Sequence, residues 1–366
     1  RTGENGWDHD PAGKEYKSFA DFMEQRDPEK PFFFWYGNTS VALGRWRYGP
    51  EHLGDMNPDT VRIPPNLPDT VEVRETILAY YGAVQKQDRI FGEAVQRIED
   101  AGMLDDTLVI YTGDNGWQMP RGLANCYDGG VRIPLAMRWG NRIEADRKGD
   151  GFVSLTDFAP TFLELTGLNV PQDMTGQSFA GAITGQDNLP SRDHVFLERE
   201  RHANVRQNNG SYPMRAIRTR DFLYIWNLRP NRWPAGDPDA WMSVGEFGDV
   251  DGSWAKDFIL ENRDTPEIQP FFELNFGKRP EEELYDLKKD PHQVTNVATD
   301  PGYEAKKKEL RERVKSWMVE TNDPRLNPKY DDYDRFPYFG GTVFEEDGTR
   351  KPKRMHWLER KRELGR

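Results

Sequence analysis

Two adjacent oxygen-bearing side chains, Asp114 and Asn115, follow an apolar run in the segment YTGDNGWQMPRG (residues 111–122). A carboxylate and an amide carbonyl suit a hard cation such as calcium or magnesium better than zinc or copper. An Asp-Asn-Gly triplet is also a common turn sequence, because Asn and Gly tolerate left-handed backbone and Asp caps its neighbours. Since two ligands do not complete a metal site, the triplet by itself leaves a cation site and a plain turn both open.

A second candidate site is the loop LERERHANVRQNNGSYPMR (residues 197–215), which is rich in hydrogen-bond donors. Such a concentration of donors is unlike a random solvated face in a chain whose formal net charge is −12. A ligand-binding loop is one reading of this pattern, and an exposed surface loop is the alternative. The donors are Arg199, Arg201, His202, Asn204, Arg206 and Arg215.

The elements that position Asp114 and Asn115 follow from the apolar pattern. PFFFWYG (31–37), TLVIYTG (107–113) and RIPLAMRW (132–139) have the composition of buried strands. Asp69 and Glu72 form a capping box, after which apolar residues recur at helical spacing up to Gly102. Strand, helix and strand in this order predict a right-handed crossover and an α/β sheet with helices on both faces. Ligands of such sheets lie beyond the carboxyl ends of the strands, where Asp114 and Asn115 are expected.

The pattern changes after residue 185. Short strands such as FLYIW and EELYDL, separated by turns, precede a last helix, YEAKKKELRERVKSWMVET. We therefore predict three parts: an α/β part in residues 1–185, a smaller α+β domain with an antiparallel sheet in 186–326, and a charged extension in 327–366. The connection from 229 to 281 is too long for a simple loop and is expected to be a folded insertion near the substrate opening.

Composition excludes several function classes. Lys and Arg total 50 against 62 Asp and Glu, so the chain is a poor candidate for tracking a nucleic-acid backbone. No stretch approaches the roughly 18 apolar residues of a membrane span. The single cysteine, Cys126, rules out an internal disulfide and a thiolate-clustered zinc site, and a small packed side chain is its expected role.

Several motifs together resemble one family. DNG is followed by NCYDGGVRIPLAMRWGNRI, VSLTDFAPTFLELTGL, MTGQSF and, near the end, ELYDLKKDPHQVTNVA. Their order and spacing resemble type I sulfatases of the alkaline phosphatase superfamily, over about residues 30 to 325. SYPMRAIRTRDFLYIWNLRP and WMVETNDPR are similar to the heparan N-sulfatase (sulfamidase)-like branch. The resemblance implies an alkaline phosphatase-like sheet with helices on both faces and a smaller α+β C-terminal domain.

The resemblance also implies a chemistry. Type I sulfatases hydrolyse sulfate esters or sulfamates with a formylglycine nucleophile held against calcium by Asp and Asn side chains. By this match Asp114 and Asn115 are the downstream half of a calcium site, and Arg121 is the candidate contact to sulfate. Arg199, His202 and Arg206 are the candidate substrate-binding residues, because the matching loop of the branch lines the substrate pocket. A sulfated carbohydrate substrate and a periplasmic or secreted location follow from the same resemblance.

The sequence departs from the family pattern in three ways. No Cys-x-Pro/Ala-Ser-Arg motif is present, so we expect the nucleophile and the paired Asp ligands upstream of residue 1, and no sulfate hydrolysis by these 366 residues alone. Thr39 lies where the family has a sulfate-binding His, and Leu123 where it has a basic residue. Arg121 either replaces that basic residue or is a solvated arginine, and surface exposure is favoured for Arg45 and Arg47.

Three functions therefore stay open after the sequence alone. The first is a calcium-dependent carbohydrate sulfatase. The second is a catalytically silent relative that binds sulfated glycans through loop 199–215. A phosphoesterase of the same superfamily is a weaker third, because it shares the metal-bearing turn but not the remaining motifs.

Overall fold

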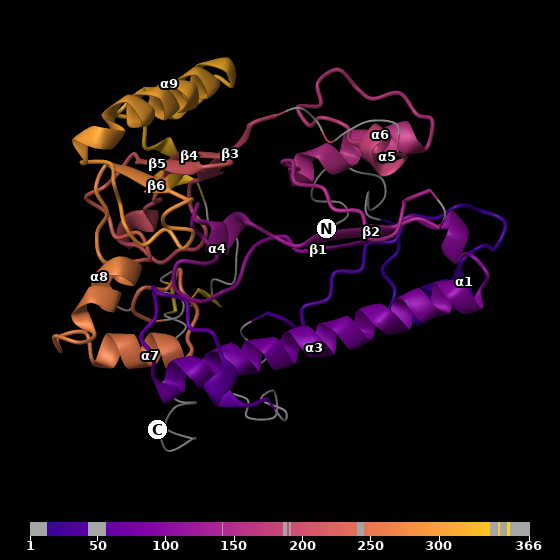
Figure 1. Cartoon of the computed structure of the whole chain (residues 1–366), viewed down its shortest axis with the longest axis horizontal. Helices are drawn as coiled ribbons and strands as arrows, with labels where there is room; N and C mark the ends of the chain where they lie inside the picture. Colours follow the sequence, from indigo (N-terminus) through magenta and orange to yellow (C-terminus); the bar gives the residue numbers. More distant parts are fainter. Residues whose placement is uncertain are drawn as a thin grey trace.

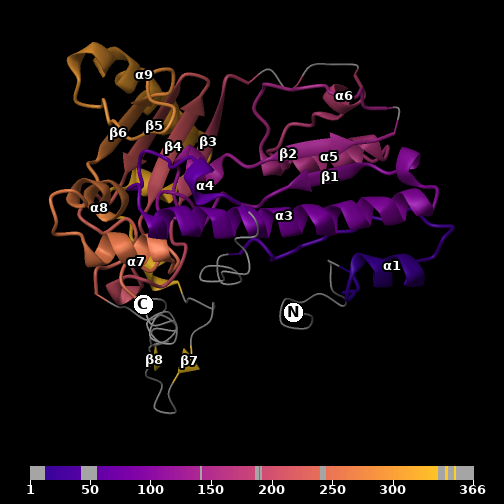
Figure 2. The ribbon, with the colours of Figure 1, turned by 60° about the horizontal axis from the view of Figure 1, so that its bottom comes forward.

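The structure is a computed structural model, which describes residues 13–42, 56–140, 142–185, 189, 192–239, 245–336, 343–344 and 350–351. Figure 1 shows two sheet-containing regions along one long helix, α3 (Val71–Asp100). In Figure 2 the four-stranded sheet lies near one end of α3, and β1, β2, α5 and α6 lie along the rest of it. Within these described ranges no helix is long and apolar enough to cross a membrane. Most of the predicted extension 327–366 falls outside them.

The long helix was predicted from its apolar periodicity, and α3 confirms it. The predicted cap was wrong, because the N-cap residue is Thr70, whose hydroxyl accepts a hydrogen bond from the Val73 amide. Asp69 instead pairs with Arg74 at 2.6 Å. A side-chain N-cap of this kind stabilises a helix by about 1 kcal/mol. The helix buries one stripe of residues, including Val73 and Ile77.

The sheet next to α3 has two strands, β1 (Val109–Thr112) and β2 (Leu135–Arg138). They pair antiparallel, with Val109 opposite Arg138, and the predicted crossover from residues 31–37 is not seen, because those residues form no ladder among the described residues. Helices cover both faces of this ribbon, as expected (Figure 1). On one face Val109 packs with α1 (Phe19–Gln25) and α3. On the other face Met137 packs with α5 (Phe158–Leu165) and α6 (Ala180–Ile183).

The segment PFFFWYG was predicted to be a buried strand, and this prediction was wrong. Residues 31–37 are extended but form no ladder among the described residues. Phe32 and Phe34 pack against the α1–α3 core, whereas Phe33 and Trp35 are 71% and 79% exposed. Phe33 lies 5.8 Å from the ring of Phe162 in α5. Alternate side chains therefore point toward the two helical layers, as they would in a strand, but one side has little cover.

The C-terminal half contains an antiparallel sheet, as predicted. Its strands are β3 (His194–Arg199), β4 (Met214–Thr219), β5 (Phe222–Asn227) and β6 (Glu282–Asp286), in that order across the sheet. The helix α9 (Glu304–Glu320) covers one face, where Leu310 and Val314 pack on Tyr224. The other face packs against Cys126 and Tyr127. The last two strands, β7 (Val343–Phe344) and β8 (Arg350–Lys351), pair only with each other.

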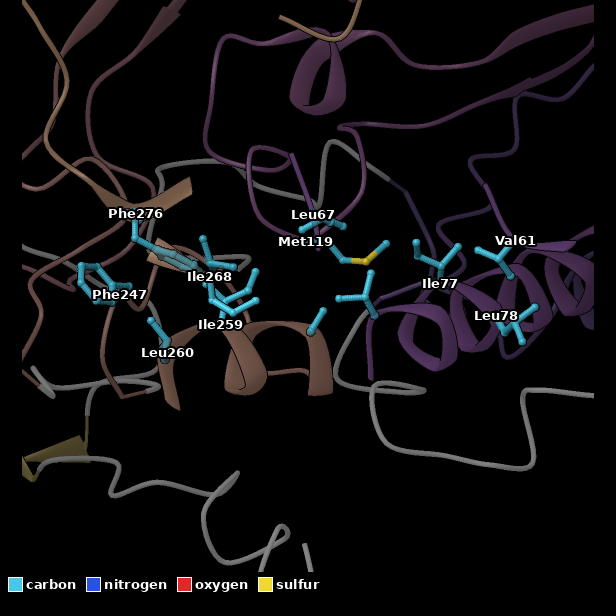
Figure 3. Close-up of a cluster of buried hydrophobic side chains, with 14 residues drawn as sticks. Val61, Leu67, Ile77, Leu78, Met119, Phe247, Ile259, Leu260, Ile268 and Phe276 are labelled. Atoms are coloured by element: carbon cyan, nitrogen blue, oxygen red, sulfur yellow. The ribbon is translucent and has the colours of Figure 1, made fainter. Parts of the chain in front are cut away.

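The long connection between β5 and β6 is folded, as predicted. It contains α7 (Trp254–Glu261) and α8 (Gln269–Phe276), which share one buried core with α3. Figure 3 shows this core, in which Met119 lies beside Leu67 and Ile77, with Ile259 and Phe276 farther along. Met119 comes from the segment that follows β1. Through Met119, this core therefore anchors the segment that follows Asp114 and Asn115.

Candidate functional site

The first site is built on loop 113–130, which begins where β1 ends and returns through α4 (Asp128–Val131) to β2. The Gly116 amide donates to the Gly130 carbonyl at 2.9 Å and closes the loop at its base. A Cβ at Gly116 would lie 1.9 Å from the Gly129 carbonyl oxygen. Glycine is therefore required where the two halves of the loop meet, and this contact fixes the direction in which the Asp-Asn pair leaves the strand.

Asp114 is exposed and Asn115 is half-buried at this end of β1. Their side chains form one hydrogen bond, from Asn115 Nδ2 to Asp114 Oδ1 at 2.9 Å. No cationic side chain pairs with Asp114 within the described part of the chain, so its charge faces solvent. Two neighbouring oxygen donors with one uncompensated charge fit a hard cation. No group of three or more His, Cys, Asp or Glu side chains with metal-binding geometry occurs among the described residues.

Arg121 lies on the same loop, but its guanidinium group points into the protein. Nη1 donates to the Leu274 carbonyl at 3.0 Å and Nη2 to the Gln293 carbonyl. The guanidinium carbon stacks 3.7 Å from the ring centroid of Tyr127. Arg121 is 5% exposed. These contacts link the loop to α8 and to turn 290–293.

Cys126 is buried beneath the four-stranded sheet. Burial raises the pKa of its thiol to about 12. A thiol in this state is neither a ready nucleophile nor a ready metal ligand, because both roles require the thiolate. The expectation of a packed side chain is confirmed.

In the second site, three predicted substrate-binding residues converge on one buried carboxylate, Asp249. Arg199 donates to Asp249 Oδ2, as does Arg206 at 2.6 Å. His202 Nδ1 lies 3.2 Å from Asp249 Oδ1. Burial acts to raise the pKa of Asp249, but the two guanidinium groups and the imidazole hold that pKa well below its usual range. Of the three basic side chains around Asp249, only that of His202 is substantially exposed to solvent, at 35%.

Sequence reasoning did not identify Asp249. It belongs to the folded insertion, 43 positions from Arg206, and no short motif marks it. Elsewhere in the loop, Arg215 pairs with Asp323 and with Glu200, and its side chain is 2% exposed. Most of the donors that made the loop conspicuous are therefore held by carboxylates inside the protein.

The Asp114–Asn115 pair and the side chains around Asp249 are separate sites within the described part of the chain. Among the described residues no hydrogen bond or ion pair connects Asp114 or Asn115 with Arg121 or with loop 199–215. Thr39 is exposed and Leu123 is half-buried, whereas Arg45 and Arg47 lie outside the described residues. The two sites and Arg121 share a scaffold, because the loop 113–130 packs on the sheet whose first strand, β3, ends at Arg199.

Comparison with known proteins identifies two matching family models. The sulfatase model matches residues 9–168, and the model for the C-terminal part of N-sulphoglucosamine sulphohydrolase matches residues 113–234. Their overlap includes loop 113–130. The second model also reaches through loop 199–215.

Two curated relatives and one solved structure are similar to this chain. An ulvan-active sulfatase of Formosa agariphila is 28% identical, covering 78% of this chain and 47% of its own length. Human N-sulphoglucosamine sulphohydrolase is 31% identical, covering 83% of this chain and 63% of its own length. A Bacteroides thetaiotaomicron structure from work on glycosaminoglycan metabolism has a TM-score of 0.55 at 19% identity, covering 87% of this chain and 60% of its own. The chain thus spans about half to three fifths of these proteins.

Proposed function

This chain belongs to the sulfatase family, and from that premise we propose that the protein hydrolyses sulfate ester or sulfamate groups on a sulfated carbohydrate. The observation that carries the proposal is the Asp114–Asn115 pair. Its carboxylate is exposed at the end of β1 and forms no ion pair within the part of the chain that the structure describes, in a loop that both family models match. The curated relatives act on ulvan or carry the name of a sulphoglucosamine hydrolase, which supports a sulfated glycan as the substrate class.

We propose that Asp114 and Asn115 hold a calcium ion together with ligands from outside the described residues. A hard divalent ion held by these two residues would supply a positive charge that could polarise a sulfate oxygen and lower the pKa of an attacking hydroxyl. The protein's own contribution is the fixed geometry of the loop. The Gly116–Gly130 hydrogen bond and the buried Met119 hold the oxygen donors at the strand end.

The nucleophile must come from another residue than Cys126, because this buried thiol has a raised pKa and lies under the sheet. Covalent catalysis needs an activated nucleophile within reach of the reacting centre. We propose a formylglycine outside these 366 residues. The coverage of 47% and 63% of the two curated relatives leaves length for such a segment.

We propose that loop 199–215 contacts the glycan through His202. Its ring is partly open to solvent, and Asp249 holds it from the interior. Arg199 and Arg206 act on the substrate mainly through Asp249, because each of them donates to that carboxylate and to the Pro234 carbonyl. Arg121 is proposed to support the sulfate site by fixing loop 113–130. A polymeric glycan substrate supports a periplasmic or secreted location.

The proposal is tested by measuring inorganic sulfate released from ulvan and heparan oligosaccharides by the full-length protein. Asp114→Ala should lower the rate by roughly a hundredfold or more, because loss of a metal-bound charge removes several kcal/mol of transition-state stabilisation. Asp105→Ala, an exposed acidic residue before the same strand, is the matched control and should retain the wild-type rate. Equal activity of the Asp114 variant and wild type would refute the calcium assignment.

A catalytically silent glycan-binding protein is the second candidate. Thr39 and Leu123 favour it, since both are uncharged where the family resemblance implies basic residues. This candidate predicts that the full-length protein binds sulfated oligosaccharides through His202 but releases no sulfate from them. Sulfate release that depends on Asp114 would exclude it.

A further inference from the structure

A cleft of about 210 Å³ lies between loop 113–130 and turn 290–293. Its apolar lining includes Trp117, Tyr127, Pro64 and Pro291. Its lining also includes polar side chains, among them Asn66, Asp128, His292 and Gln293. Pockets for drug-sized ligands start at roughly 300 Å³, so this cleft suits a smaller molecule or a single unit of a chain.

The backbone at the floor of the cleft is unusual. Arg121 and Gln293 both have left-handed backbone, with φ of 60° and 59°, and neither is glycine. Such residues persist only where their surroundings fix them, and they cluster at ligand clamps and active sites. Here they fix one another, because the Arg121 guanidinium donates to the Gln293 carbonyl. The Gln293 Oε1 in turn accepts from the Asp128 amide at 2.9 Å.

Gln293 also has an unused hydrogen-bond donor. The residue is 2% exposed, and its Nε2 has no hydrogen-bond partner in the described part of the chain. Buried polar groups without a partner are rare in native proteins, and each one calls for an explanation. An acceptor oxygen on a ligand in the cleft would satisfy this amide. His292 is exposed at the same turn and offers a second polar contact at the rim.

The charges in the cleft are already compensated. The Asp128 carboxylate receives two hydrogen bonds from Arg218, at 2.9 and 3.0 Å. The Arg121 nitrogens donate to two main-chain carbonyls. The Arg121 nitrogens that donate to these carbonyls are therefore not free to bind a sulfate group. Apolar walls combined with neutral donors and acceptors instead match a ring that has apolar faces and hydroxyl edges.

We propose that this cleft binds one sugar ring of the glycan, separately from the sulfate group, with Gln293 Nε2 donating to a ring hydroxyl and Trp117 contacting an apolar ring face. The inference rests on the proposed function for its choice of a glycan. It adds a recognition site that depends on the sugar and not on its sulfation. The cleft is lined in part by loop 113–130, which also carries the Asp114–Asn115 pair.

The test uses the full-length protein and oligosaccharide mixtures from ulvan and heparin, each before and after chemical desulfation. Titration calorimetry should detect binding of at least one desulfated mixture to wild type. Gln293→Glu keeps the oxygen that accepts from the Asp128 amide and removes the unpartnered NH₂ group. We expect this variant to bind both forms of that glycan about tenfold more weakly, as loss of one neutral hydrogen bond predicts.

Two controls keep the inference falsifiable. His292→Ala changes an exposed side chain, so it should fold normally and weaken binding of the desulfated glycan even if Gln293→Glu does not fold. Wild-type affinity for the desulfated glycan in His292→Ala, or no binding of any desulfated mixture to wild type, overturns the proposal. If sulfate release is lost in Asp114→Ala but unchanged in both cleft variants, the proposed sugar-binding role of the cleft is refuted. The sulfatase assignment then still stands.

Discussion

Replacing Asp249 by Asn should strongly destabilise the protein. The substitution keeps the shape of the side chain and one acceptor for His202, but it removes the charge shared by Arg199 and Arg206. All three side chains of this ion cluster are buried, with exposures of 2%, 7% and 3% for Asp249, Arg199 and Arg206. Breaking a buried pair by removing one partner costs about 3–5 kcal/mol. Because two guanidinium groups lose their partner together, we expect a loss at the upper end, about 5 kcal/mol.

The assay is urea unfolding at pH 7, with Asp150→Asn as the matched control. Asp150 pairs with Arg220, but these side chains are 86% and 71% exposed, and such pairs contribute about 1 kcal/mol or less. The lowered pKa of Asp249 means that its contribution is present above the usual Asp range and is lost as the pH falls below about 4 toward the folded-state pKa. The gap between wild type and Asp249→Asn should therefore shrink in acid. A cost no larger than that of Asp150→Asn would refute the reasoning.

Three other predictions concern stability, solubility and the nucleophile. The purified 366-residue chain should turn over an aryl sulfate no faster than its Cys126→Ala variant, and a clear difference would show that the nucleophile has been misplaced. Phe33→Thr combined with Trp35→Thr should raise the concentration at which the chain stays monomeric in sedimentation, because both rings are exposed; unchanged aggregation would count against this. Burial lowers the pKa of Lys256 to about 8 from the ordinary 10.5, so unfolding free energy should rise between pH 8 and 10.5, by up to roughly 3 kcal/mol. That rise should be missing in Lys256→Met.

The sequence predicted those elements whose signal is local. The helix now seen as α3 has a long amphipathic repeat, and the strands FLYIW and EELYDL are short segments between turns, so each was found. Residues 31–37 misled the prediction, because seven mostly aromatic residues resemble a buried strand whether or not a neighbouring strand pairs with them. Pairing depends on segments far away in the chain, which composition does not reveal.

In the candidate sites, too, features with a local sequence signal were predicted and features that depend on distant segments were not. Asp114 and Asn115 could be proposed from their types and their place after β1, because a turn that ends a strand is a local feature. The roles of Arg199 and Arg206 could not, because the carboxylate that holds them lies in a distant insertion. A cluster of arginines in sequence indicates charge, but only the fold decides whether that charge faces a ligand or an internal carboxylate.

Calcium titration calorimetry tests the proposed calcium site at the Asp114–Asn115 pair most directly. The measurement compares the full-length wild-type protein with Asp114→Ala and with the control Asp105→Ala, each first treated with a chelator. We predict saturable calcium binding by wild type and by Asp105→Ala, with a matching rise in melting temperature, and the loss of both in Asp114→Ala. Calcium binding of equal affinity in wild type and Asp114→Ala would contradict the account.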